Sequence, residues 1–280
     1  MNVSMAKGLE MEEEKDPVKK VGPFLGRILI YPIKSLDGVS VSEARMTNGG
    51  ILEFDRIHAI VDETGAYVNA KRFARVQLLR TEYAPDFQEI LIGETGNATR
   101  HRFSLTDTVP LNRWLSDFFG LNVTLTSEMR SGFPDDRTAF GPTVTSVASL
   151  REIAGWFSEL PLDNVRRRFR SNLELEGSVP FWEDQLFGQP NELKPFQIGE
   201  VNFLGHNPCQ RCVVPTRDPE YANPVANFQK TFMARRKETL PSWAVAERFN
   251  HYYRFAINTS VLETEQGKRL RVGDPVQLAA

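Results

Sequence analysis

The residues with the clearest chemical potential are Cys209 and Cys212, the only two cysteines of the chain. They form a C-x-x-C motif within the sequence HNPCQRCVVPTRDP, which starts at His206 and ends at Pro219. In a reducing compartment, thiols this close together more often serve metal or redox chemistry than a structural disulfide. The motif is therefore the first candidate for a functional site.

Four interpretations of the motif are open. A thioredoxin-type centre needs its first cysteine at a helix N-terminus, and Val213, Val214 and Pro215 argue against a helix there. Structural zinc needs four ligands, whereas the motif supplies two thiols and His206 as a third candidate. The pair could also be two small buried thiols in a turn. In the fourth interpretation, one thiolate binds a soft metal whose other ligands come from a cofactor, and Arg211 holds negative charge nearby.

A second candidate feature is a run of basic residues, Arg166, Arg167, Arg168 and Arg170. Alternation of polar and apolar residues from Val165 to Leu175 predicts a strand. One face of that strand would carry Arg166, Arg168, Arg170, Asn172 and Glu174. Guanidinium groups bind phosphate in a bidentate manner, so this face could hold a phosphate or the edge of a heterocycle. Basic runs are more often solvated surface, and the isolated Lys34 has the same ordinary explanation.

The elements that must position these residues in the first half are mainly strands. Apolar runs and alternation predict strands over Phe24 to Tyr31, Val39 to Val41, Ile57 to Val61, Ala66 to Val68, Val76 to Thr81, Glu89 to Ile92 and Asn122 to Thr126. Two of these strands, Ile57 to Val61 and Ala66 to Val68, are separated by a short turn and are predicted to form a hairpin. Apolar residues at helical spacing predict a helix over Pro110 to Phe119, which Gly120 would end.

The second half is predicted to be rich in strands as well. A capping-box pattern at Ser149 and Glu152 predicts the start of a helix. Further strands are predicted over Val201 to Leu204, Tyr253 to Val261 and Leu270 to Leu278, with a helix over Val225 to Lys237. The polar, turn-rich stretch Ser127 to Gly141 predicts a domain boundary. We expect a disordered tail over 1–20 and two domains over 21–128 and 129–280.

Composition excludes several classes of protein. With 34 Lys and Arg against 36 Asp and Glu, the net charge is −2, so no overall field attracts nucleic acid or an anionic membrane. The sequence has no apolar stretch of membrane-spanning length, no signal-peptide pattern, no Walker loop and no dinucleotide-binding glycine fingerprint. We expect a soluble cytoplasmic protein with no membrane or nucleic-acid partner.

Several short motifs, taken in order, resemble one family. They are YPIKS from Tyr31, GVSVSEA from Gly38, Asp55-Arg56, VNAKR from Val68, RFRSN from Arg168, CQRC from Cys209 and RVGDPV from Arg271. Together they resemble the MOSC-domain molybdenum proteins with an N-terminal MOSC companion domain, of the mitochondrial amidoxime-reducing component type. The match runs from about Val21 to Leu278. It implies a β-rich α+β fold, with an N-terminal β-barrel-like domain followed by a MOSC β-barrel domain with a few helices.

The resemblance also implies a molybdenum–molybdopterin cofactor. The cofactor's dithiolene sulfurs would bind the metal, and Cys212 would be the protein ligand and the catalytic residue. The family positions that hold the pterin and its phosphate match Lys34, Ser35, Lys71, Phe140, Arg170, Asn172, Gln210 and Arg211. Lys71 stands where the family has an arginine, and Phe140 where it has a small polar residue.

The implied reaction is the reduction of N-hydroxylated compounds, such as hydroxylamines and amidoximes. Electrons would come from a separate ferredoxin- or cytochrome-type protein and its reductase. A rival hypothesis is a non-catalytic protein that carries the molybdenum cofactor or its sulfur. A third, an RNA-binding module that uses the arginine run, is weakened by the neutral net charge. Mitochondrial members begin with a membrane anchor, whereas this chain begins with a charged segment, so their location does not carry over.

Overall fold

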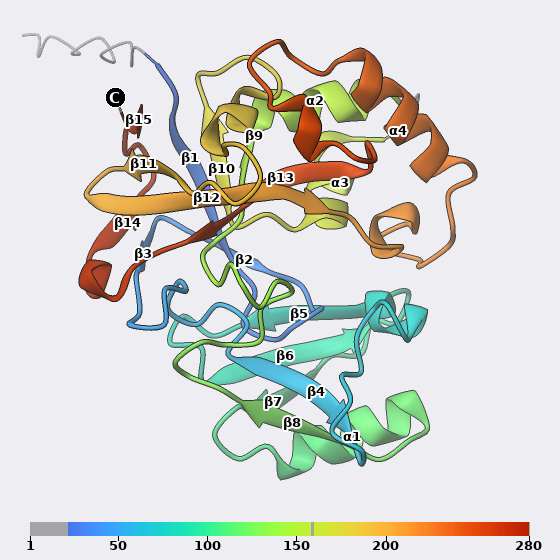
Figure 1. Cartoon of the computed structure of the whole chain (residues 1–280). Helices are drawn as coiled ribbons and strands as arrows, with labels where there is room; N and C mark the ends of the chain where they lie inside the picture. Colours follow the sequence, from blue (N-terminus) through green and yellow to red (C-terminus); the bar gives the residue numbers. More distant parts are fainter. Residues whose placement is uncertain (1–21, 158–159, 280) are drawn as a thin grey trace, which may run out of the picture.

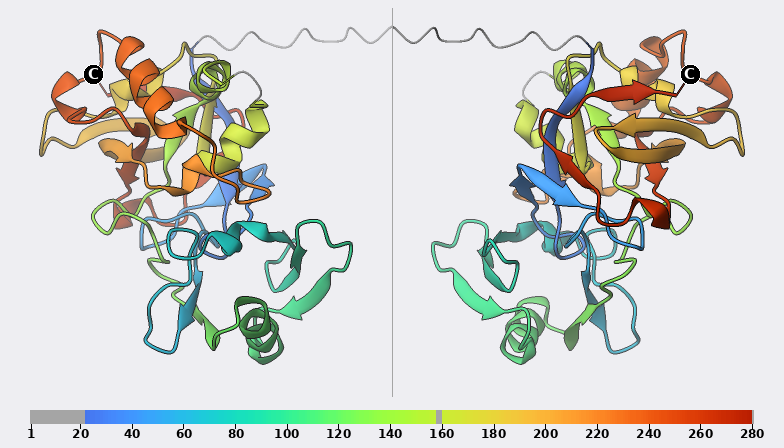
Figure 2. Two further views of the ribbon diagram at one scale, coloured as in Figure 1. Left: turned by 90° about the vertical axis from the view of Figure 1, so that its right-hand side faces the viewer. Right: turned by 90° about the vertical axis from the view of Figure 1, so that its left-hand side faces the viewer.

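The computed structural model describes residues 22–157 and 160–279, and the disordered tail predicted over 1–20 lies outside them (Figure 1). The fold is α+β and rich in strands, as predicted. Figure 1 and the two side views in Figure 2 show an upper part with most of the chain's C-terminal half and a lower part built from earlier segments. Among the described residues, no helix combines the length and the apolar character needed to cross a bilayer.

The upper part is organised by an eight-stranded sheet in the order β15-β11-β12-β13-β9-β10-β1-β2. Its strands are β1 (Phe24–Ile30), β2 (Val39–Val41), β9 (Val144–Ser146), β10 (Leu173–Glu176), β11 (Lys194–Ile198), β12 (Val201–Gln210), β13 (Arg254–Ser260) and β15 (Val276–Leu278). Only β9 and β10 run parallel to each other in this sheet. The two N-terminal strands therefore sit in one sheet with strands of the C-terminal half.

A second pairing joins the two ends of the chain. Strand β3 (Glu43–Arg45) pairs with β14 (Arg269–Arg271) in an antiparallel ribbon. Buried residues of the N-terminal strands, including Leu25 and Ile28, share one apolar core with Phe196, Phe203 and other C-terminal residues. The predicted division at residues 128 and 129 remains a prediction.

The lower part contains the remaining strands and one helix. Strands β5 (Leu79–Tyr83), β6 (Glu89–Glu94) and β7 (His101–Ser104) form an antiparallel sheet, while β4 (His58–Asp62) pairs with β8 (Val123–Ser127). Helix α1 (Val109–Phe119) buries Leu111, Leu115 and Phe118 against them. It ends at Gly120, whose φ of 68° is left-handed, so the predicted helix and its end are confirmed.

Three helices cover the upper sheet: α2 (Val147–Gly155), α3 (Leu162–Phe169) and α4 (Phe228–Glu238). They share an aromatic core in which Phe169, Phe228 and Phe232 are almost fully buried. Short 3-10 turns complete the described structure at Ala74–Leu78, Trp182–Leu186, Val214–Thr216, Ala246–Arg248 and Glu263–Glu265.

The strand predicted from Val165 to Leu175 is wrong. Residues Leu162–Phe169 form helix α3, Arg170 turns the chain with a left-handed φ of 55°, and β10 begins only at Leu173. Val165 and Phe169 are four residues apart, so the same apolar pattern also fits one face of a helix, and both side chains are buried there. The arginines consequently do not share a face.

Smaller differences have local causes. The N-cap of α2 is Ser146 rather than Ser149, because Ser146 Oγ accepts a hydrogen bond of 3.1 Å from the Ser149 backbone N–H. The predicted strand from Ala66 to Val68 is reduced to one bridge between Tyr67 and Val61. Strand β12 continues well beyond the predicted Leu204, because its pairing with β13 extends to Gln210. This extension places Cys209 inside a strand.

Candidate functional site

A cavity of about 1160 Å³ lies between the upper and lower parts. It is lined by residues that follow β1, by β5, by α3 and the turn after it, by the end of β12 and by the 131–143 segment. All nine predicted site residues line it: Lys34, Ser35, Lys71, Phe140, Arg170, Asn172, Gln210, Arg211 and Cys212. Residues far apart in sequence therefore meet around one space.

The wall of the cavity is strongly basic. Of the described residues that line it, fourteen are lysine or arginine and eight are aspartate or glutamate. The whole chain has a net charge of −2, so the positive charge is concentrated here rather than spread over the surface. A partly enclosed cationic cavity favours an anionic ligand.

The two cysteines have different surroundings. Cys209 is buried, and its Sγ atom donates a hydrogen bond of 2.6 Å to Asn258 Oδ1. Burial raises the pKa of this thiol to about 11, against the opposing charge of Arg211. Cys212 is half-buried, just beyond the end of β12, and its thiol is free like that of Cys209. Cys212 is thus the accessible thiol of the pair.

The structure bears on the other interpretations of the C-x-x-C motif. Cys209 lies within a strand, so it lacks the helix N-terminus of a thioredoxin centre. His206 is hydrogen-bonded through Nε2 to Ser260 Oγ at 2.7 Å and is not part of the cavity wall. Over residues 22–157 and 160–279, no three His, Cys, Asp or Glu side chains form a group that could hold a metal ion.

The segment after Cys212 is fixed by a buried arginine. Arg168 is 1% exposed, and its Nη1 atom donates to the backbone oxygens of Pro215 at 2.8 Å and Arg217 at 2.6 Å. Arg217 in turn donates to the Ala70 oxygen, at 2.6 Å, in the lower part. Arg168 therefore holds the chain near Cys212. Its Nη2 atom, which has no hydrogen-bond partner among the described residues, lies 3.6 Å from the Asp218 carboxylate.

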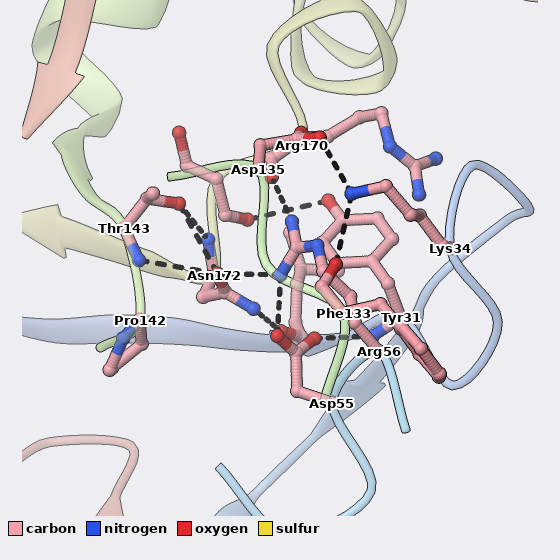
Figure 3. A network of polar contacts seen from close by, with 12 residues as sticks. Tyr31, Lys34, Asp55, Arg56, Phe133, Asp135, Pro142, Thr143, Arg170 and Asn172 are labelled. Carbon is pink, nitrogen blue, oxygen red and sulfur yellow. Dashed lines mark hydrogen bonds and ion pairs between the residues drawn. The ribbon is translucent and has the colours of Figure 1, made fainter. Parts of the chain in front are cut away.

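Arg170 behaves differently from the other arginines of the run. Its guanidinium lies over the ring of Tyr31, 4.2 Å from the ring centre, and Arg56 lies over the same ring at 4.9 Å. Within the described part of the chain, the buried Nη2 atom of Arg170 has no hydrogen-bond partner. Figure 3 accordingly shows the guanidinium with no dashed line to a neighbour. Burial lowers its pKa, which shows the cost of keeping this cation in the cavity wall.

Asn172 is occupied by a protein network rather than open to a ligand. Its Oδ1 atom accepts hydrogen bonds from Arg56 Nη1 at 3.1 Å and from the backbone N–H and hydroxyl of Thr143, each at 3.2 Å. Its amide donates to the Leu29 oxygen at 3.0 Å. Arg56 also pairs with Asp55, which accepts the backbone N–H of Tyr31 at 2.9 Å (Figure 3). This network ties the end of β1 to the turn before β10.

Lys34 is buried, and its ammonium group faces a carboxylate. Its Nζ atom donates to Asp135 Oδ1 at 2.7 Å and to the Phe133 oxygen at 2.9 Å. Lys71 Nζ lies 3.7 Å from the same Asp135 oxygen. Partial desolvation in the cavity opposes the shift, but the charges of Lys34 and Lys71 hold the pKa of the Asp135 carboxyl well below its usual range. Two predicted cationic residues thus meet at one carboxylate.

The remaining predicted site residues differ in exposure and in whether the protein already uses their polar groups. Arg211 donates from Nη2 to the Phe169 oxygen at 2.6 Å, so part of its guanidinium is already used by the protein. Gln210 is exposed at the end of β12, and Phe140 is 37% exposed at the cavity. Ser35 has a φ of 73°, a strained backbone conformation directly after Lys34.

Sequence reasoning did not assign roles to Tyr31, Arg56 and Asp135. Tyr31 and Arg56 lie within motifs that carried the family resemblance, which was the available signal for them. Burial raises the pKa of Tyr31 to about 12, so it stays neutral between two guanidinium groups. Nothing in the pattern around Asp135 indicates that it would reach Lys34, because that contact depends on the folding of the 131–143 segment.

Comparison with known proteins gives two domain matches and several relatives. Residues 23–160 match the MOSC N-terminal beta barrel domain, and residues 135–277 match the MOSC domain. The chain is 28% identical over 226 positions to the molybdenum cofactor sulfurase of Drosophila grimshawi, covering 69% of this chain and 28% of that protein. It is 26% identical over 297 aligned positions to mitochondrial amidoxime-reducing component 1 of Mus musculus, covering 91% of this chain and 82% of that protein.

A further relative is mitochondrial amidoxime reducing component 2 of Macaca fascicularis, which is 26% identical over 301 aligned positions, covering 90% of this chain and 82% of that protein. The chain spans less than a third of the length of the sulfurases of Drosophila grimshawi and Drosophila willistoni, at 28% and 30%. The similarity therefore covers most of the amidoxime-reducing components but only a portion of the sulfurases.

Proposed function

The chain belongs to the MOSC domain family, which binds the molybdenum cofactor, and from this premise we propose that it reduces N-hydroxylated compounds. The substrates would be hydroxylamines and amidoximes, and the electrons would come from a separate ferredoxin- or cytochrome-type protein and its reductase. The observation that carries the proposal is the cationic cavity, with a half-buried free thiol and an arginine whose Nη2 has no hydrogen-bond partner among the described residues.

The donor set of the cavity fits the cofactor. Molybdenum is a soft metal in this setting, and a thiolate is the protein ligand that suits it. Cys212 offers an accessible thiol on the cavity wall, whereas the thiol of Cys209 is buried and hydrogen-bonded to Asn258. We therefore assign the metal ligand to Cys212 and a packing role to Cys209.

The phosphate of the cofactor requires cationic hydrogen-bond donors on the cavity wall. Arg170 Nη2 is buried without a partner among the described residues, and an oxyanion would supply the missing acceptor. Lys34, with Ser35 beside it, adds a second cation on the same cavity wall. The proposed binding set retains Lys71, Phe140, Gln210 and Arg211, and gives Asn172 the task of holding Arg56 and the turn that presents Arg170.

The chain's own residues would bind and orient rather than carry electrons. When bound, the cofactor supplies a two-electron centre that can accept an oxygen atom from the substrate. The ring of Tyr31 contacts the guanidinium groups of both Arg56 and Arg170 and helps to hold them at the cavity wall. Arg168 keeps the segment after Cys212 in place through the oxygens of Pro215 and Arg217. These contacts preorganise the site before any ligand enters.

A second candidate function is the carriage of the molybdenum cofactor or its sulfur without turnover. The similarity to molybdenum cofactor sulfurases favours it. Both functions would use Cys212 and the same cationic wall. They differ in whether an N-hydroxylated compound is consumed.

The deciding experiment uses protein purified from a host that makes the cofactor. Metal and pterin analysis establishes loading, and benzamidoxime is then offered with reduced viologen or with NADH alone. We expect turnover with viologen and none with NADH, because the chain has two cysteines, too few to ligate an iron–sulfur cluster with four thiolates, and no dinucleotide-binding fingerprint. No turnover with viologen at full molybdenum loading would favour the carrier function.

A further inference from the structure

Part of the cavity wall, here called the lobe, is formed where the lower part meets helix α3. It is lined by Arg80 of β5, Arg100 before β7, Arg167 of α3 and Asp37 before β2. In Figure 1, β5 is the strand of the lower sheet that faces the upper part. The function proposed above gives no task to this lobe.

Two arginines from different parts of the fold converge on one backbone oxygen there. Arg80 Nη2 lies 3.3 Å from the Pro219 oxygen, and Arg167 Nη2 lies 3.1 Å from the same atom. Two guanidinium groups are thus held side by side across the cavity wall. Like charges at this separation repel each other, so an anion between them would stabilise the arrangement.

The least exposed carboxylate of the lobe is Asp37, whose side chain is 27% exposed. Asp37 pairs with Arg80 at 3.2 Å, and its backbone partner is the Thr81 N–H at 3.1 Å. Burial raises the pKa of Asp37, and the charges of Arg167, Arg170 and Arg100 all act against that rise. Asp37 thus pairs with the guanidinium group of Arg80 and lies within the electrostatic influence of three others.

Two further carboxylates on the lobe lie toward solvent. Glu220 is 3.6 Å from Arg167 Nη1, and its side chain is 45% exposed. Glu82 lines the lobe and is exposed as well. Solvent screens such pairs strongly, so they neutralise the buried part of the lobe poorly.

The lobe also contains buried polar atoms that have no hydrogen-bond partner among the described residues. Among the described residues, the buried Arg80 Nε and the buried Gln77 Oε1 have no hydrogen-bond partner, and the Gln77 residue is only 8% exposed. Arg100 donates from Nη1 to backbone oxygens, including that of Asn97 at 2.8 Å, and has no carboxylate partner in the described structure. Buried donors and acceptors are rarely left unsatisfied unless a ligand or water completes them.

We propose that Arg80, Arg100 and Arg167 form an anion-binding subsite for a carboxylate or phosphate group on the substrate. This inference rests on the proposed function for the identity of the substrate, which would be an N-hydroxylated compound that carries a negative charge. Gln77 would accept a hydrogen bond from the same molecule. The subsite is distinct from Arg170 and Lys34, which are assigned to the cofactor.

The first test is independent of turnover. Inorganic phosphate is titrated calorimetrically into the molybdenum-loaded protein, in which the cofactor already occupies its own phosphate site. We expect one phosphate to bind, and Arg167→Ala and Arg100→Ala each to weaken binding about tenfold through loss of a charge-assisted hydrogen bond. Arg102→Ala is the matched control, because Arg102 is exposed on β7, pairs with Glu89 at 2.8 Å and does not line the cavity.

Several results would overturn the subsite. Phosphate that binds only to cofactor-free protein would show that the lobe belongs to the cofactor site. Absence of binding, or equal binding by wild type, Arg167→Ala and Arg100→Ala, would show that the arginines only join the two parts of the fold. Circular dichroism and thermal melting of each variant establish that it is folded.

The second test addresses the substrate. The KM values of benzamidoxime and 4-carboxybenzamidoxime are compared, and we expect their ratio to change about tenfold in Arg167→Ala and not in Arg102→Ala. An unchanged ratio in Arg167→Ala would contradict the assignment to a substrate anion. If neither compound reacts although phosphate still binds through Arg167 and Arg100, the reductase function fails and the anion subsite stands.

Discussion

The Lys34 ammonium nitrogen lies 2.7 Å from Asp135 Oδ1, and Lys71 Nζ lies 3.7 Å from the same oxygen. The carboxylate thus occupies the position where two cationic residues assigned to the cofactor meet. Its side chain is 66% exposed, while that of Lys34 is 8% exposed, so Asp135 is the solvent-facing partner of the pair. An incoming phosphate must compete with this carboxylate for Lys34.

Because Asp135 competes with phosphate for Lys34, removal of its negative charge should tighten anion binding. In Asp135→Asn the negative charge is lost while the shape of the side chain is kept, so Lys34 and Lys71 become available to a ligand. We expect cofactor-free Asp135→Asn to bind inorganic phosphate several-fold more tightly than wild type, as measured by calorimetry. Asp136→Asn, which changes a neighbouring carboxylate that has no ion pair with Lys34, is the control. Weaker binding by Asp135→Asn would mean that Asp135 helps to build the site.

The two thiols should differ in reactivity with pH. The folded pKa of Cys209 is about 11, above the value of about 8.5 for an unfolded cysteine. The thiol form is therefore favoured by folding, and its contribution to stability is present below pH 8.5 and is lost as the pH rises toward 11. In cofactor-free protein at pH 8, we expect iodoacetamide to label Cys212 and to leave Cys209 unmodified.

Peptide mass spectrometry measures this difference directly. Cys212→Ser should abolish labelling of the native protein, and denaturation should restore labelling at Cys209. Rapid modification of Cys209 in the folded protein at pH 8 would contradict its burial and its hydrogen bond to Asn258.

Substitution of each cysteine should separate metal binding from packing. Cys212→Ser should lose activity and change the molybdenum absorption spectrum while the dithiolene retains the metal, because an alcohol replaces a thiolate poorly on a soft metal. Cys209→Ser should keep activity and absorption and lose stability by about 1 kcal/mol, since a smaller and more polar group replaces a buried sulfur. Absorption spectroscopy with activity assays, and chemical denaturation, supply the two readouts. Equal loss of activity and absorption in both variants would indicate a paired-thiol or zinc site.

Arg170→Ala should lower the fraction of protein that carries cofactor. Loss of a charge-assisted contact to phosphate costs about 1.5–3 kcal/mol, or roughly ten- to a hundredfold in affinity. The fold should survive, because the guanidinium contacts the ring of Tyr31 and its Nη2 has no hydrogen-bond partner in the described structure. Pterin analysis of the purified variant measures the effect, with Arg102→Ala as the control. Full loading of Arg170→Ala would remove this residue from the site.

The sequence predicted which residues would lie around one cavity better than it predicted their contacts. The order of short motifs identified nine residues, and all nine line one cavity. The alternation predicts Arg168 and Arg170 on one strand face, yet Arg168 donates to two backbone oxygens and pairs with Asp218, whereas the guanidinium of Arg170 lies over the ring of Tyr31. That difference depends on the end of α3 at Phe169 and the left-handed Arg170, which local periodicity does not reveal.

The elements of the fold also differ in whether local sequence or distant contacts determine them. Helix α1 was predictable because its apolar stripe and Gly120 are adjacent in sequence. Strand β9 was missed because its three residues are buried between β10 and β13, and only those distant partners make it a strand. The contact between Lys34 and Asp135 joins residues that lie in separate segments, so no local pattern could indicate it.

The position of β1 has a consequence for how the chain is made. Ile28 pairs with Leu173 in β10, and Ala44 of β3 pairs with Leu270. During synthesis, the first strands leave the ribosome long before either partner exists, and they must stay unpaired until most of the chain has emerged. Contacts of such long sequence separation slow folding and leave strand edges open to other chains. Production of this protein should therefore depend on slow translation, low temperature or chaperones that shield these strands.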